Sequence, residues 1–138
     1  MTAPVAFGVP AEAAFDFLVD PANRPLWQSS LRRVEDVEPA QPCVGQTWTD
    51  VTAPGIRPLM ETTVLDRPRR WTEVGRWHGV TAELTLTFEP SPTGCNVRAL
   101  AVVRAPLVGR AVTAFAPYAI TGDLKRAARI LLGRAPGK

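Results

Sequence analysis

The chain has 138 residues, of which 46% are hydrophobic and 21% are charged, a mixture typical of a globular protein and unlike that of a disordered one. Its formal net charge of +3 comes from basic residues scattered along the chain, so no concentrated basic surface for nucleic acid is predicted. No apolar run reaches the roughly 18 residues of a membrane span, and a signal peptide is not recognisable at the N-terminus. We therefore expect a single cytoplasmic domain, residues 1–138, without a transmembrane segment.

The N-terminal part of the chain predicts one short strand followed by two helices. Residues 4–9 are strand-like, and residues 11–18 read as a helix that begins after a proline. The Pro-rich stretch 20–25 ends this helix. Residues 26–31 then predict a second, shorter helical piece, because proline suits the first helical position.

From Arg32 onward, apolar and polar residues alternate with the period of half-buried strands. Breaks rich in Gly and Pro divide this region into six predicted strands, at about 32–38, 46–52, 59–66, 70–77, 80–89 and 95–104. The turns between them are too short for parallel crossovers. Together with the first strand, these segments predict an antiparallel meander of seven strands.

Residues 106–133 predict one long amphipathic helix at 100° per residue. Its apolar stripe changes along its length: Gly109, Thr113 and Ala116 come first, and Ile120, Leu124, Ala127 and Leu131 follow. Laid across a sheet, such a helix would pack firmly at its C-terminal half and leave a void at its N-terminal half. The fold class predicted is α+β, with a curved seven-stranded antiparallel sheet wrapped around the C-terminal helix and two short helices after the first strand.

Strand pairing predicts the other wall of this void. A two-residue turn at His78–Gly79 opposes Trp71 to Leu86, Glu73 to Leu84, Gly75 to Ala82 and Trp77 to Val80. The next hairpin opposes Phe88 to Val97, Leu86 to Ala99, Leu84 to Ala101 and Ala82 to Val103, and the preceding one opposes Val64 to Trp71, Thr62 to Glu73 and Met60 to Gly75. Opposed residues share a face, so small residues gather on the side that meets the helix.

This patch and the aromatic residues define a predicted cavity for an apolar ligand. The predicted ligand-binding residues on the sheet are Trp48, Met60, Thr62, Trp71, Gly75, Trp77, Ala82, Leu84, Ala99 and Ala101, and those on the helix are Thr113, Ala116 and Ile120.

Three residues are candidates for acid–base catalysis: Glu73, His78 and Asp50. Glu73 is predicted to face inward, where loss of hydration raises the pKa of a carboxyl group. Alternatively, Glu73 lies at the open end of the sheet or is ion-paired with Arg98 or another arginine. His78 fits a turn residue at the cavity rim equally well, and the register leaves the direction of Asp50 open.

The two cysteines, Cys43 and Cys95, lack the spacing of a redox or zinc motif, so neither a disulfide nor a metal site is predicted. No phosphate-binding glycine motif occurs, and no cofactor is predicted. The sequence leaves open whether the chain forms a homodimer.

Five segments of the chain resemble the START-like, Bet v 1-like helix-grip superfamily (SRPBCC), and within it the bacterial polyketide cyclase/dehydrase-type proteins. These are AFDFLVDPANRPLW (14–27), VGQTW (44–48), DRPRRW (66–71), TFEP (87–90) and GCNV (94–97). The resemblance implies a deep cavity between sheet and final helix that holds lipids, polyketides or other apolar molecules, with Trp27 near its mouth or wall. It transfers no catalytic residue, because no catalytic motif of the family is matched.

Three functions follow as hypotheses. The first is binding of a small or medium hydrophobic ligand in the cavity. The second is a cyclase, dehydratase or isomerase that uses Glu73, with His78 or Asp50, to move protons. The third is a protein-interaction or membrane-surface module that works through Phe115, Tyr118 and the basic face of the final helix.

Overall fold

The computed structural model describes the backbone of residues 1–53, 55–105, 110–111 and 116–134. The elements are, in chain order, β1 (Val5–Phe7), α1 (Ala11–Val19), η1 (Pro21–Asn23), α2 (Arg24–Trp27), β2 (Leu31–Glu38), β3 (Thr47–Thr52), β4 (Leu59–Asp66), β5 (Arg70–Trp77), β6 (Val80–Ser91), β7 (Gly94–Ala105), β8 (Arg110–Ala111) and α3 (Ala116–Arg134).

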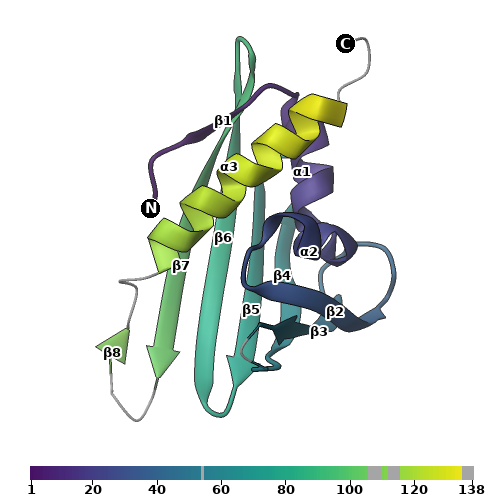
Figure 1. Cartoon of the computed structure of the whole chain (residues 1–138), viewed down its shortest axis with the longest axis vertical. Helices are drawn as coiled ribbons and strands as arrows, with labels where there is room; N and C mark the ends of the chain where they lie inside the picture. The colour runs from purple at the N-terminus through teal and green to yellow at the C-terminus, as the bar shows by residue number, and fades with distance from the viewer. Residues whose placement is uncertain (54, 106–109, 112–115, 135–138) are drawn as a thin grey trace.

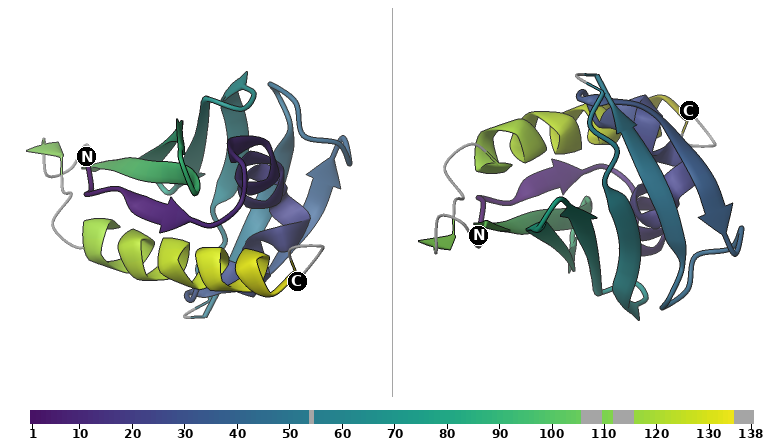
Figure 2. Two further views of the ribbon diagram at one scale, coloured as in Figure 1. Left: turned by 90° about the horizontal axis from the view of Figure 1, so that it is seen from above. Right: turned by 90° about the horizontal axis from the view of Figure 1, so that it is seen from below.

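The strands form one antiparallel sheet in the order β1-β7-β6-β5-β4-β3-β2, with the short β8 paired to β7. The helices α1, α2 and α3 lie on one side of this sheet (Figure 1). Figure 2 shows that the sheet is curved, so that β2 and β3 stand at an angle to β6 and β7 and the helices lie inside the curve. The predicted α+β class, the seven-stranded meander and the long C-terminal helix are confirmed.

The register predicted for the two central hairpins is confirmed. In the β5–β6 hairpin, Trp77 opposes Val80 and Trp71 opposes Leu86. The turn residues His78 and Gly79 both have positive φ, 47° and 79°, as a type I′ turn requires. All four predicted pairs of the β6–β7 hairpin are also present: Phe88–Val97, Leu86–Ala99, Leu84–Ala101 and Ala82–Val103.

The β4–β5 hairpin corrects one predicted pair. Trp71 opposes Leu65 and not Val64, because Asp66 pairs with Arg70 and the turn is one residue longer than predicted. The register then shifts between Thr62 and Val64. This irregularity compensates for the longer turn, so Thr62 still opposes Glu73 and Met60 still opposes Gly75, as predicted.

Two predicted helix boundaries are wrong. The second helical piece is α2, which ends at Trp27, and β2 already begins at Leu31. The helical turns start early because the Asp20 side chain accepts a hydrogen bond from the Ala22 amide, 3.0 Å, and caps η1.

The final helix begins at Ala116 and not at residue 106, since Arg110–Ala111 pairs with β7 as β8. Pro117 thereby falls in the first turn of α3, where a proline costs no intrahelical hydrogen bond. Gly109 and Thr113 lie outside the described residues. The C-terminal half of the predicted stripe is confirmed in part: Ile120, Leu124 and Ala127 are buried, and Leu131 is half-buried.

Candidate functional site

A cavity of about 370 Å³ lies between the sheet and α3. Its wall is built by residues from α2, β3, β4, β5, β6, β7, α3 and the loops beside them. The lining residues are Arg24, Gln28, Ser30, Asp50, Thr52, Ile56, Pro58, Met60, Glu73, Gly75, Trp77, Val80, Ala82, Glu83, Leu84, Ala101, Val103, Ile120 and Asp123. Most of this surface is apolar, and the polar residues come chiefly from the α2, β3 and α3 side.

Small side chains on neighbouring strands leave room for the cavity. Gly75 opposes Ala82 across β5–β6, and Ala101 opposes Leu84 across β6–β7. A Cβ atom at Gly75 would lie 2.7 Å from the sulfur of Met60, so glycine lets the Met60 side chain pack against this strand. The floor of the cavity is therefore set by residue size on three strands.

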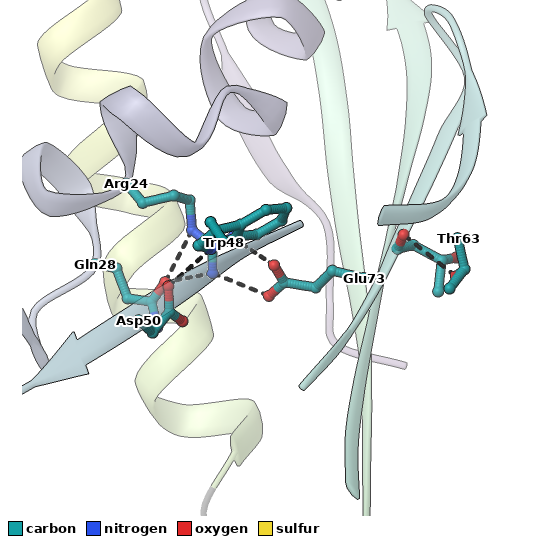
Figure 3. A network of polar contacts seen from close by, with 7 residues as sticks. Arg24, Gln28, Trp48, Asp50, Thr63 and Glu73 are labelled. Atoms are coloured by element: carbon teal, nitrogen blue, oxygen red, sulfur yellow. Dashed lines mark hydrogen bonds and ion pairs between the residues drawn. The ribbon is translucent and has the colours of Figure 1, made fainter. Parts of the chain in front are cut away.

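Arg24 and Glu73 form the centre of the polar side (Figure 3). Arg24 Nη1 donates to Glu73 Oε1 at 2.6 Å, and Nη2 donates to Oε2 at 2.9 Å, in a bidentate pair. The guanidinium also lies 5.2 Å from the ring centre of Trp27 and 5.6 Å from that of Trp71. Burial would lower the pKa of Arg24, but Glu73 and the nearby acids raise it above its usual value.

Two further N–H groups of Arg24 donate to Gln28. Arg24 Nε donates to Gln28 Oε1 at 2.9 Å, and Nη2 donates to the same oxygen. On the α3 side of the cavity, the buried Asp123 accepts the backbone N–H of Ser29 through Oδ1, at 3.2 Å. This contact ties α3 to the segment after α2, so the polar residues of the cavity are held by two helices and two strands.

Asp50 is a buried carboxyl group with a raised pKa. It is 4% exposed, and Trp48 Nε1 donates to its Oδ1 at 2.8 Å. Burial raises the pKa of Asp50 to about 6, and the nearby Glu73 adds to this rise, whereas Arg24 and the Trp48 hydrogen bond oppose it. A carboxyl group with such a pKa exchanges its proton near neutrality.

The structure brings together two of the three predicted acid–base residues. Glu73 and Asp50 both line the cavity. Glu73 is held by Arg24 and not by Arg98, which lies 3.5 Å from Glu89. His78 is an exposed turn residue whose ring contacts Trp77 edge-on, and it is absent from the cavity wall.

The predicted ligand-binding residues divide into two layers. Seven of them line the cavity: Met60, Gly75, Trp77, Ala82, Leu84, Ala101 and Ile120. Five are buried behind this wall: Trp27, Trp48, Thr62, Trp71 and Ala99. Trp27, Trp48 and Trp71 lie deeper than predicted because Trp27 and Trp71 pack against the Arg24 guanidinium and the Trp48 indole donates to Asp50.

Part of the prediction for the final helix lies outside the described residues. This holds for Thr113 and Phe115, and for the side chains of Ala116 and Tyr118. The interaction-module hypothesis therefore stays a prediction.

Sequence reasoning missed six polar residues of the cavity wall: Arg24, Gln28, Ser30, Thr52, Glu83 and Asp123. Asp123 could have been found, because it follows the buried Ile120 by three residues and precedes the buried Ala127 by four, the spacing of one helix face. Arg24 and Gln28 carry no such signal, since their segment is too short to show a period.

No metal-binding cluster of three or more His, Cys, Asp or Glu side chains occurs in the part of the chain that the structure describes. Both cysteines are free thiols, and burial raises the pKa of the Cys95 thiol to about 11. Within the same residues, no helix has the length and apolar character needed to cross a membrane.

The fold and cavity define a helix-grip protein, and comparison with known proteins places the chain in a family. Residues 1–135 match the family described as Polyketide cyclase / dehydrase and lipid transport, and the chain belongs to it. No curated protein matches the chain.

Solved structures share its fold at low sequence identity. A protein from Mesorhizobium loti is 16% identical with a TM-score of 0.77, and the match covers 98% of both chains. A protein from Deinococcus radiodurans is 23% identical with a TM-score of 0.67, covering 95% of both chains. The di-domain ARO/CYC StfQ from the steffimycin biosynthetic pathway is 14% identical with a TM-score of 0.73; the match covers 96% of this chain and 50% of StfQ.

Proposed function

We propose that the chain binds a small or medium, mostly apolar ligand in the cavity between the sheet and α3. The observation that carries this proposal is the cavity itself, about 370 Å³ with a largely apolar wall. This volume falls within the range of about 300–1,000 Å³ typical of small-molecule sites. Membership of a family of cyclases and lipid-transport proteins supports the same function.

The experiment measures binding of a neutral bicyclic probe, 2-naphthalenemethanol, by isothermal titration calorimetry. Saturable binding is expected for the wild-type protein. Ala101→Leu extends a side chain into the cavity and should weaken binding by about tenfold or more. Val102→Leu is the matched control, because successive side chains of β7 point to opposite faces and Val102 does not line the cavity. Equal binding by all three proteins would place the probe elsewhere and contradict the proposal.

A second function, a cyclase or isomerase that moves protons, is favoured by Asp50. Its carboxyl group lines the cavity and its pKa is raised to about 6, mainly by burial. Glu73 is less suited than the sequence suggested, since both of its oxygens accept hydrogen bonds from Arg24. In this reading Asp50 takes a proton from a carbon next to a carbonyl group.

Proton exchange on a ketone probe tests this second function. The C1 protons of 2-tetralone exchange in deuterated water, and NMR follows the rate. The protein should accelerate exchange as the pH rises through about 6, because Asp50 then becomes a base. Asp50→Asn should lose the acceleration, whereas exposed Glu89→Gln should keep it. Unchanged exchange with Asp50→Asn would remove Asp50 from this role.

A further inference from the structure

Carboxyl groups outnumber cationic groups in the described wall of the cavity. Arg24 is the single cation in its described wall, and four carboxyl groups accompany it: Asp50, Glu73, Glu83 and Asp123. Glu73 pairs with Arg24 through both oxygens, so these two charges compensate each other. Glu83 is exposed. The net buried charge that remains comes from Asp50 and Asp123, which are 4% and 5% exposed.

Each of these two carboxyl groups has unused hydrogen-bonding capacity. Oδ1 of Asp50 accepts from Trp48 Nε1, and Oδ1 of Asp123 accepts from the Ser29 amide. The Oδ2 atoms have no hydrogen-bond partner among the described residues. Both side chains line the cavity, where a buried carboxylate is stabilised by a donor or a positive charge.

Arg24 is poorly placed to hold an acidic ligand. Its Nε, Nη1 and Nη2 atoms already donate to Glu73 and Gln28. These bonds use four of the five N–H groups of Arg24, so a ligand carboxylate could form a bidentate pair with it only by displacing Glu73 or Gln28, and it would face Asp50 and Asp123. An anionic head group is therefore disfavoured by the charges and by the hydrogen bonds of the site.

We propose that the ligand is a cationic amphiphile, an apolar body with a protonated amine that donates to Asp50 and Asp123. This inference rests on the proposed binding function and adds the chemical class of the ligand. The amine lies on the side formed by α2, β3 and α3, and the apolar body lies against Met60, Ala101 and Ile120.

The protonation of Asp50 makes the binding of an amine depend on pH. The charged groups that act on Asp50 are Arg24 on α2 and Glu73 on β5, and Asp123 on α3 lines the same cavity and acts on Arg24. Above pH about 6, Asp50 is an anion and attracts an ammonium group; below it, Asp50 is neutral. Affinity for an amine should therefore fall as the pH is lowered through about 6, and affinity for a neutral ligand of the same shape should change less.

Calorimetry with three probes of one shape tests the inference. They are 2-naphthylmethylamine, 2-naphthalenemethanol and 2-naphthoate, titrated at pH 7.5 into the wild-type chain. The amine should bind about tenfold to hundredfold more tightly than the carboxylate, the range expected of a charge-assisted hydrogen bond. Amine binding should be weakened by Ala101→Leu, which places the probe in the cavity.

Two variants and one control test whether Asp50 and Asp123 cause the preference for the amine probe over the carboxylate probe. Asp50→Asn and Asp123→Asn keep an oxygen for the Trp48 and Ser29 donors and remove the charge, so each should reduce the preference for the amine. Glu89→Gln removes a charge outside the cavity and should leave the preference unchanged. Circular dichroism checks that each variant is folded.

The outcomes separate the two proposals. Equal binding of amine and carboxylate, or tighter binding of the carboxylate, overturns the inference and leaves ligand binding standing. A preference for the amine that survives both aspartate substitutions also overturns it. Failure of all three probes to bind overturns the binding function and the inference together.

Discussion

At the scale of single residues, the cavity depends on an ion pair that is almost fully buried. Arg24 is 1% exposed and Glu73 is 4% exposed, so both have given up hydration. The two hydrogen bonds between them and the flanking Trp27 and Trp71 rings offset that loss. Because each charge is tolerated only in the presence of the other, removal of one is expected to cost more than removal of both.

Arg24→Met should destabilise the protein by about 3–5 kcal/mol, because Glu73 is then buried without a partner. The double variant Arg24→Met/Glu73→Leu removes both charges and should recover much of this loss. Urea denaturation of the wild type, both single variants and the double variant measures the coupling. A double variant that loses the sum of the two single losses would show that the pair is not coupled.

The raised pKa of Asp50 predicts a stability cost at neutral pH. In the unfolded chain Asp50 titrates near 3.8, and in the folded chain near 6, chiefly through burial. At a pH between these two pKa values, the Asp50 carboxyl group is mostly protonated in the folded chain and mostly ionised in the unfolded chain. The free energy of unfolding therefore falls by up to about 3 kcal/mol as the pH rises from about 4 to about 6, and the loss persists above it.

Asp50→Asn should abolish this loss, since the amide keeps an acceptor for Trp48 and has no charge. The variant should be more stable than the wild type at pH 7.5 by about 1–3 kcal/mol and nearly equal to it at pH 4. Denaturation at both pH values measures the difference, with exposed Glu89→Gln as control. A variant less stable than the wild type at pH 7.5 would contradict the raised pKa.

At the scale of elements, the sequence predicted the sheet better than the helices. Alternation along β6 determined which face is buried, and the short turns, such as the two-residue turn at His78–Gly79, determined the register of two hairpins. The sequence did not predict the longer turn after Asp66 or the register shift beside Thr62. These two features compensate each other, so the alternation of apolar and polar residues in the paired strands shows neither of them.

The helices were harder to predict because the helical spacing of apolar residues extends into neighbouring segments that are not helical, so it does not mark where a helix begins. Arg110 and Ala111 fit the pattern of the final helix and yet form β8, where pairing with β7 decides their conformation. The polar residues of the cavity were harder still. Arg24 meets Glu73 across 49 positions of sequence, and no local pattern records such a contact.

Two glycines in different elements should respond oppositely to alanine. Gly94 opens β7 with φ of +151°, and a Cβ there would lie 2.1 Å from the carbonyl oxygen of Phe7, so Gly94→Ala should cost about 3 kcal/mol or more. Gly122 lies in α3 with no atom within 4 Å of such a Cβ, so Gly122→Ala should stabilise by about 0.5–1 kcal/mol. Thermal denaturation compares the two. A harmless Gly94→Ala would mean that β1 does not pack against this turn.

At the scale of the whole molecule, the curved sheet and α3 are packed so that the cavity between them stays open. The middle of α3 buries Leu124 and Ala127 completely, whereas Ile120 and Asp123, nearer its N-terminal end, border the cavity. Packing in the middle of the helix thus supports an unfilled space nearer its N-terminal end. An apolar cavity without a ligand forfeits contacts that a filled core would make, so the chain should gain stability when the space is occupied.

Ligand binding should therefore stabilise the fold by mass action. At a free probe concentration about 100 times the Kd, the free energy of unfolding should rise by about 2.7 kcal/mol, since the unfolded chain has no cavity. Thermal unfolding of the wild type with increasing 2-naphthylmethylamine should show a midpoint that climbs steadily with concentration. Ala101→Leu should gain much less at the same concentrations, because its side chain already occupies part of the space. An equal rise in both proteins would locate the binding outside the cavity between the sheet and α3.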